Sequence, residues 1–88
     1  REWSKKQLKR LGFTFPDSMS NFIFASHKTA KAEEIFEALR KNQIFVRYFK
    51  QPKLENYLRI SIGTREEMEA LFAFLETYLQ QENEKVID

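Results

Sequence analysis

Apolar residues recur along this chain at helical spacing in three places. The first stripe, in residues 2–11, is followed by Gly12, a residue that commonly stands just past a helix. The second stripe consists of Ala32, Ile35, Phe36 and Leu39. The third consists of Met68, Leu71, Phe72, Leu75, Tyr78 and Leu79. Repeats of three and four residues are typical of the buried side of a helix, so we expect three helices.

Three short segments between these stripes predict strands. Residues 22–26, 44–49 and 57–62 are apolar, aromatic or β-branched, and turn residues flank them. The expected order is α-β-α-β-β-α, with 13–21 and 50–56 as connections. We therefore expect an α+β fold in which a three-stranded sheet carries its helices on one face. Strand 57–62 should be central and antiparallel to both neighbours, because a right-handed crossover from 22–26 to 44–49 leaves that position open.

Several polar residues are candidates for fixing the helix ends. Thr29 is a candidate N-cap of the second helix, and Asn42 a candidate left-handed residue at its C-terminus. Thr64 and Glu67 have the spacing of a capping box for the third helix. The polar tail 80–88 is expected to fray.

Length and composition limit the class of protein. The 88 residues form a single domain with a thin core, and an apolar fraction of 42% is too high for a disordered chain. Without cysteine there is no disulfide and no thiolate metal site. No apolar run is long enough to span a bilayer, and the charged start is not a signal peptide. We expect a cytoplasmic protein and, since the first residue is not Met, a piece of a larger one.

Charge is unevenly distributed along the chain. Lys and Arg predominate in residues 1–53, whereas Asp and Glu predominate in 54–88, although the net charge is only +2. A basic half with aromatic residues is typical of a protein with an anionic partner. Solvated helix faces that differ in sign would give the same asymmetry, so the pattern leaves both interpretations open.

The predicted hairpin carries the most specific candidate site. Folding 44–49 back on 57–62 about Lys53 places Arg47 opposite Arg59, on the side of the sheet away from the helices. Like charges in this position destabilise a strand pair, and guanidinium groups fit carboxylates and phosphates well. Arg47 and Arg59 are therefore candidate binding residues for an anionic small molecule; two solvated arginines over aromatic rings are the alternative. The same side is expected to carry Phe45, Phe49, Tyr57 and Ser61.

Other kinds of chemistry find little support. His27 has no second histidine and no cysteine nearby, so we expect a surface residue rather than a ligand or base. We interpret the acidic residues near the starts of the second and third helices as solvated charges that the helix dipole stabilises. We expect no metal site, no catalytic residue and no glycine-rich phosphate loop in this chain.

The hairpin also carries a resemblance to a known family. The segment LENYLRISIGTREE, residues 54–67, resembles the C-terminal part of histidinol-phosphate aminotransferases. LGF at 11–13, DSMSNF at 17–22, AEEIFEALRKNQI and IFVRYF resemble further segments of that family in the same order. The resemblance extends from about Lys6 to Leu79.

The resemblance implies that this chain is the small C-terminal domain of a larger, homodimeric, fold-type I enzyme. Such enzymes use pyridoxal phosphate to move an amino group between histidinol phosphate and glutamate or 2-oxoglutarate in histidine biosynthesis. It implies that the cofactor and its lysine belong to a large domain outside these residues. It also implies that Arg59 binds the acidic group of the substrate and that Arg47 helps to bind phosphate. Tyr48 departs from the family, which often has a small or acidic residue there, so related substrates such as threonine phosphate, aspartate or aromatic amino acids stay open.

Two further classes of function compete with this one. An aromatic sheet face with arginines resembles an RNA-recognition domain, but IFVRYF lacks the glycine of that motif, and the chain begins and ends with a helix. A protein-interaction domain is the other alternative. We expect no nucleic-acid or membrane partner, and an isolated chain without transaminase activity. Lys5 lies in a stretch similar to a pyridoxal-lysine motif, but large residues follow it and we expect it on an exposed helix.

Overall fold

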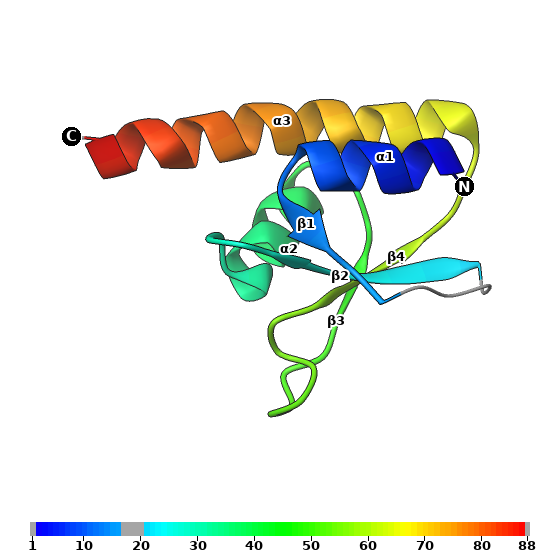
Figure 1. The fold of residues 1–88 in the computed structure, drawn as a ribbon, viewed down its shortest axis with the longest axis horizontal. Helices are drawn as coiled ribbons and strands as arrows, with labels where there is room; N and C mark the ends of the chain where they lie inside the picture. The colour runs from blue at the N-terminus through cyan, green and yellow to red at the C-terminus, as the bar shows by residue number, and fades with distance from the viewer. Residues whose placement is uncertain (1, 17–20, 88) are drawn as a thin grey trace.

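The computed structural model describes residues 2–16 and 21–87, with side chains as far as Glu82. Its elements are α1 (Glu2–Arg10), β1 (Phe13–Thr14), β2 (Phe22–His27), α2 (Ala32–Lys41), β3 (Arg47–Tyr48), β4 (Leu58–Ser61) and α3 (Arg65–Ile87). All three helices lie on one side of the sheet, and the loop between β3 and β4 extends away on the other (Figure 1). The α+β class and the one-sided helical layer are confirmed.

The sheet is antiparallel with the order β1-β2-β4-β3. Strand β4 lies between β2 and β3, which confirms the predicted central position of 57–62. The predicted register of the hairpin is also confirmed, because Arg47 is the partner of Arg59 and Tyr48 the partner of Leu58.

The sheet has four strands, so the expectation of three was wrong. Phe13 and Thr14, which the sequence placed in a connection, pair with His27 and Ser26 of β2. Gly12 makes this possible because its φ of 95° turns the chain directly after α1. A strand of two residues has no measurable period, so the hydrophobic pattern did not reveal it.

The strands of the hairpin are shorter than predicted. Only Arg47–Tyr48 and Leu58–Ser61 belong to the ladder, instead of 44–49 and 57–62. The backbone N–H of Ile44 donates to the carbonyl of Leu39 at 2.9 Å, which ties the first residues after α2 to that helix. Residues 44–46 therefore do not join the sheet.

The capping box of α3 is confirmed. The backbone N–H of Thr64 donates to Glu67 Oε1 at 2.8 Å, and the N–H of Glu67 donates to Thr64 Oγ1 at 3.1 Å. The helix then continues to Ile87 and includes most of the tail 80–88, whose fraying stays a prediction. Glutamine, glutamate and lysine in this tail have good helix propensity, which explains its helical backbone.

Both expectations for the ends of α2 were wrong. The helix begins at Ala32 without a side-chain cap, and the N–H of Thr29 instead donates to His27 Nδ1 at 3.1 Å. At the other end Asn42 has a φ of −101°, and the left-handed residue is Gln43 with a φ of 61°. The Asn42 side chain donates to the Ala38 carbonyl at 3.0 Å. Asn42 therefore satisfies a helix carbonyl through its side chain, without adopting a left-handed backbone conformation.

The core lies between the sheet and its helices. Strand residues alternate, so Ile23 and Ala25 of β2 and Leu58 and Ile60 of β4 are buried against the helical layer. The other buried apolar residues are Leu8, Phe13, Ala32, Ile35, Leu39, Met68, Leu71, Phe72, Leu75 and Leu79. Phe36, which belongs to the predicted buried stripe, and Val46 are only half-buried against it.

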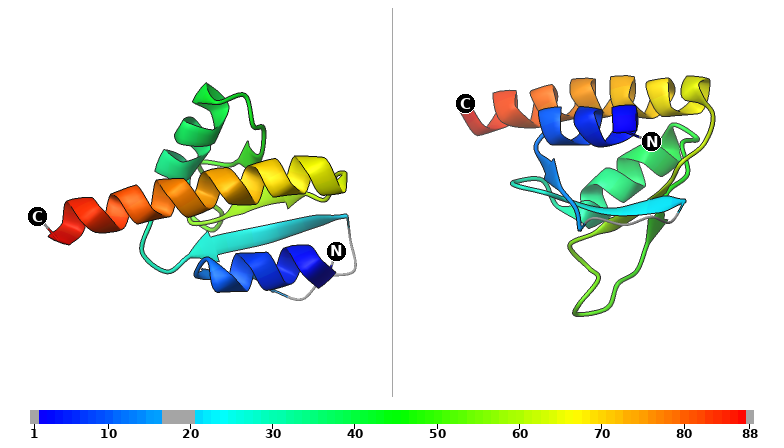
Figure 2. Two further views of the ribbon diagram at one scale, coloured as in Figure 1. Left: turned by 90° about the horizontal axis from the view of Figure 1, so that it is seen from above. Right: turned by 45° about the vertical axis from the view of Figure 1, so that its right-hand side comes forward.

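Helices α1 and α3 lie side by side over the sheet (Figure 2). Trp3 meets Phe72 edge to face with ring centroids 5.4 Å apart, and Arg10 pairs with Glu76 at 3.3 Å. Within 2–16 and 21–87, no helix has the length and apolarity needed to cross a bilayer.

Candidate functional site

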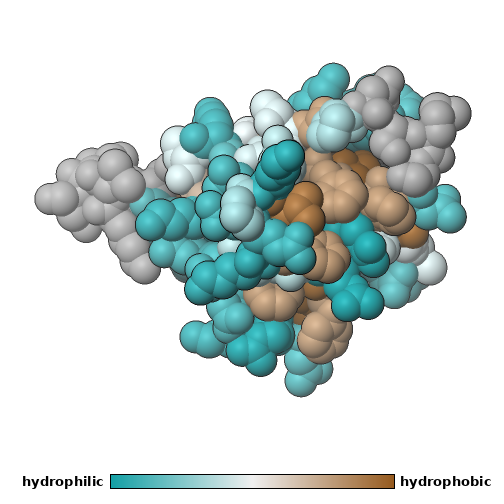
Figure 3. All heavy atoms as spheres, turned by 90° about the horizontal axis from the view of Figure 1, so that it is seen from below, coloured by the Kyte–Doolittle hydropathy of each residue, from teal (hydrophilic) through white to brown (hydrophobic). Residues whose placement is uncertain are grey.

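The side of the sheet away from the helices brings aromatic and basic residues together. Across neighbouring strands, Phe24 of β2 is the partner of Arg59, and Arg59 is the partner of Arg47. Partners across a sheet point to the same side, which is opposite to the core residues that flank them. Seen from this side, hydrophobic side chains gather in one area with hydrophilic ones around them (Figure 3). We call the group formed by Phe22, Phe24, Arg47, Phe49 and Arg59 the arginine face.

Arg59 is half-buried at the middle of the arginine face. Its Cζ lies 4.8 Å from the ring centroid of Phe22 and 5.8 Å from that of Phe49. Its Nε is buried without a hydrogen-bond partner, the one such side-chain atom within the described part of the chain. A buried donor without a partner costs about 1–3 kcal/mol, so this N–H is suited to an acceptor from outside the chain.

Arg47 has different surroundings, although its Cα is the partner of that of Arg59. It is exposed at the outer strand and lines a hollow of about 340 Å³ together with Arg40, Tyr48 and Phe36. Among the described residues it makes no ion pair. The structure thus places both predicted arginines on adjacent strands, with Arg59 at the protected centre and Arg47 at the open edge.

Sequence reasoning missed two of the aromatic neighbours of Arg59. Phe22 and Phe24 lie on β2, and their rings meet edge to face at 5.7 Å. The available signal was their alternation with Ile23 and Ala25. Phe45, expected on this side, is outside the ladder; it lines both the hollow beside Arg47 and a second hollow of about 380 Å³ that includes core residues.

His27 has a structural role. Its Nδ1 accepts from the N–H groups of Thr29 at 3.1 Å and Ala30 at 3.0 Å, and its Nε2 lies 2.9 Å from the carbonyl of Leu11. Because Nδ1 accepts, the proton is on Nε2 and donates to that carbonyl. Burial lowers the pKa of His27, so the ring is neutral and both nitrogens are occupied. The ring is half-buried, which the expectation of a surface residue did not anticipate.

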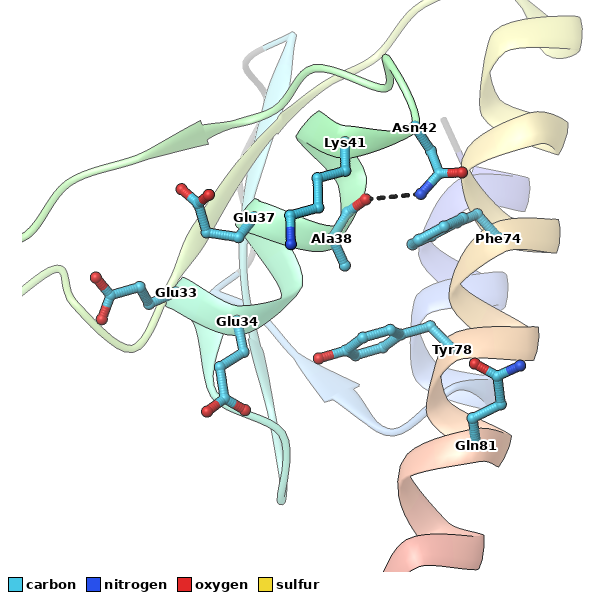
Figure 4. Close-up of a pocket in the computed structure, with 9 residues that line it drawn as sticks. All are labelled: Glu33, Glu34, Glu37, Ala38, Lys41, Asn42, Phe74, Tyr78 and Gln81. Atoms are coloured by element: carbon cyan, nitrogen blue, oxygen red, sulfur yellow. Dashed lines mark hydrogen bonds between the residues drawn. The ribbon is translucent and has the colours of Figure 1, made fainter.

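Another hollow, of about 570 Å³, lies between α2 and α3 (Figure 4). Glu33, Glu34 and Glu37 line it from α2, and the stacked rings of Phe74 and Tyr78 line it from α3. Two of these carboxylates already form ion pairs: Glu33 lies 3.7 Å from Lys50, and Glu37 lies 2.8 Å from Arg40. Its acidic lining makes this hollow unsuitable for an anion, and it is on the helical side of the sheet.

Neither Lys5 nor the arginine face fits pyridoxal phosphate. The cofactor needs a lysine amine for its aldehyde and donors for its phosphate. The side chain of Lys5 is 16% exposed, although we expected it on an exposed helix, and its Nζ lies 3.8 Å from Glu2 Oε2 on the same helix. The arginine face contains no lysine. No group of three or more potential metal ligands occurs within the described residues either.

Comparison with known proteins identifies relatives of this chain. Residues 1–75 match the family described as aminotransferase class I and II. A histidinol-phosphate aminotransferase from Lactococcus lactis subsp. lactis is 45% identical over 84 residues, which cover 96% of this chain and 23% of the relative. One from Clostridium acetobutylicum is 53% identical over 68 residues, 77% of this chain and 19% of the relative. A crystal structure from Burkholderia pseudomallei, assigned to the aminotransferases, superposes with a TM-score of 0.76 at 30% identity and covers 90% of this chain and 24% of that one.

This chain belongs to the aminotransferase class I and II family. Within that class it is similar to proteins named histidinol-phosphate aminotransferase, which confirms the resemblance first noted at residues 54–67. The chain spans only 23% and 19% of the length of the two curated relatives named above.

Proposed function

We propose that this chain is the substrate-facing C-terminal domain of a pyridoxal-phosphate aminotransferase, and specifically of a histidinol-phosphate aminotransferase. The observation that carries the proposal is the buried Nε of Arg59, which has no hydrogen-bond partner among the described residues and belongs to an arginine that forms no ion pair with a described carboxylate. Family membership and the names of the relatives support the same conclusion.

In this proposal the arginine face binds and orients the acidic end of the substrate. Arg59 donates to the phosphate of histidinol phosphate or to a carboxylate of glutamate, and charge-assisted hydrogen bonds of this kind are short and strong. Arg47, exposed at the outer strand, adds a second positive charge on the phosphate side. Neighbouring rings exclude water and so strengthen the attraction.

Other parts of the longer protein complete the enzyme. Pyridoxal phosphate supplies the electron sink for amino transfer, and we place its site and its lysine outside these 88 residues. The longer protein would be a cytoplasmic homodimer, and the isolated chain would have no transaminase activity. A Schiff base trapped by borohydride on Lys5 of the isolated chain would contradict this assignment.

Substitution of Arg59 in the longer enzyme tests the proposal. Loss of a charge-assisted contact costs about 1.5–3 kcal/mol, so Arg59→Gln should raise KM for histidinol phosphate roughly 10- to 100-fold with a smaller effect on kcat. Arg47→Gln should act in the same direction more weakly, mainly on phosphorylated substrates. Arg10→Gln is the matched control, because Arg10 is exposed on α1 and paired with Glu76. An unchanged KM in Arg59→Gln would exclude this residue from substrate binding.

A further inference from the structure

We propose that Phe22 and Phe49 are positioning residues that hold the guanidinium of Arg59 ready for an anion. This inference rests on the proposed function of Arg59. Neither ring touches the reacting atoms in the proposal; each acts through the arginine.

The two rings reach Arg59 from different neighbours of its strand. Arg59 is on β4, Phe22 is on β2, and Phe49 directly follows β3. In the register of the sheet Phe22 is the partner of Ser61, two positions along β4 from Arg59 on the same face. The Cζ–centroid distances of 4.8 Å and 5.8 Å are within the range of cation–π attraction.

Rings can hold an arginine without using its hydrogen-bond donors. The five N–H groups of a guanidinium lie in its plane, and the attraction of a cation to a ring face consumes none of them. A carboxylate would fix the side chain too, but it would occupy those donors and cancel the charge. The rings therefore keep Arg59 ordered and still able to bind an acidic ligand.

Other arginines of this chain are held in the opposite way. Arg10, Arg40 and Arg65 each pair with a glutamate, at 3.3 Å, 2.8 Å and 3.4 Å. Even Arg65, whose Cζ lies 3.7 Å from the ring centroid of Trp3, has such a partner in Glu69. Across 2–16 and 21–82, Arg59 is the arginine that two rings hold and no carboxylate neutralises.

The expected benefit is a smaller entropic cost of binding. Fixing a long, freely rotating side chain at the moment of association weakens binding by about two- to tenfold. An arginine that is already ordered avoids most of that loss. Removing either ring should therefore reduce affinity for an anion without removing the charge.

The experiment uses the 88-residue chain and two readouts by NMR. The first is the chemical shift of the Arg59 Nε–H proton without ligand, which nearby ring currents displace. The second is titration with inorganic phosphate. Phe22→Leu and Phe49→Leu should each return the proton toward its position in an unstructured arginine and weaken phosphate binding by about two- to tenfold. Phe22→Tyr, which keeps the ring, should preserve both values.

Phe74→Leu is the matched control, because Phe74 is half-buried on α3, on the helical side of the sheet, where its ring stacks on Tyr78. It should change neither readout. If Phe22→Leu disturbs the fold, Phe49→Leu decides alone, since Phe49 is outside the strand ladder.

The two proposals fail in different ways. Unchanged Nε–H shifts and phosphate affinities in both leucine variants, with binding lost in Arg59→Gln, would overturn the positioning role and leave the proposed function standing. Phosphate affinity that survives Arg59→Gln would overturn the proposed function, and with it this inference.

Discussion

His27 connects three segments of the chain, mainly through hydrogen bonds to backbone groups. It is the last residue of β2, its Nε2–H donates to Leu11 after α1, and its Nδ1 accepts two N–H groups from the loop before α2. The ring also meets Phe13 of β1 edge to face, with centroids 4.9 Å apart. This arrangement requires the neutral imidazole, because only an unprotonated Nδ1 accepts hydrogen bonds.

Stability should therefore fall in mild acid. Burial lowers the pKa of His27 from its ordinary value of 6.5, so in the interval below 6.5 the unfolded chain binds more protons than the folded one. The free energy of unfolding should decrease as the pH falls from 7.5 through 6.5 toward the lowered pKa, and this part of the pH dependence should end below it. Urea unfolding at several pH values measures the slope. His27→Gln should flatten it; an equal slope in that variant would show that other groups cause it.

Alternation along the strands was enough to predict the arginines, but not their neighbours. Arg47 and Arg59 are on strands joined by a short loop, so counting back from the turn gave their pairing. Phe22 is on β2 and Arg59 is on β4, and α2 and β3 lie between these strands in the sequence. Their contact depends on how the two distant strands pair, which a local pattern does not give. The short hydrogen bonds of His27 are to backbone groups, which the residue types do not reveal.

At the scale of elements, the capping box of α3 gives a clean prediction. Thr64→Ala removes the hydroxyl that accepts from Glu67, so it should lower the free energy of unfolding by about 1 kcal/mol. Thr77→Ala is the control on the same helix. The Thr77 hydroxyl returns a hydrogen bond to Ala73 at mid-helix, and alanine has the better helix propensity, so this change should be close to neutral.

Chemical denaturation of both variants measures the difference. Equal losses of stability in the two would mean that the cap at Thr64 contributes nothing beyond an ordinary surface hydroxyl.

The elements that could be predicted were those in which the apolar repeat extends over many residues. The stripes of α2 and α3 and the order β2-β4-β3 follow from spacing and handedness. The shortening of 44–49 does not, because it depends on the left-handed Gln43 and on the hydrogen bond from Ile44 back to α2. β-branched residues favour a strand over 44–49, but the turn after α2 keeps residues 44–46 out of the sheet.

At the scale of the whole molecule, part of the charge asymmetry along the sequence is compensated by contacts within the folded chain. The basic N-terminal part and the acidic C-terminal part meet where Arg10 pairs with Glu76 across the two adjacent helices. Such exposed pairs are worth little individually. The alternative of solvated faces with opposite sign therefore accounts for α1 and α3, whereas Arg47 and Arg59 have no acidic counterpart among the described residues.

The isolated chain should associate weakly with itself. Phe45 is 76% exposed, Phe74 is half-buried beside Tyr78, and the arginine face adds further aromatic surface. Soluble monomers rarely expose continuous apolar patches larger than a few hundred Å². Light scattering should show an average mass that rises with concentration, and Phe45→Ser should reduce the rise. A mass that stays monomeric up to millimolar concentration would contradict the prediction.

The central position of β4 has a consequence for the order in which the chain can fold. During synthesis β2 emerges early, but its only available partner is the two-residue β1, and β3 has none until β4 follows it. Pairing β2 with β4 must close a long loop that contains α2 and β3, and the entropy of that closure is lost before the contacts repay it. A growing chain that has not reached Leu58 thus has helices without a sheet to cover. Because Arg59 is on that last strand, the chain gains its sheet and its candidate anion-binding residue in one late step.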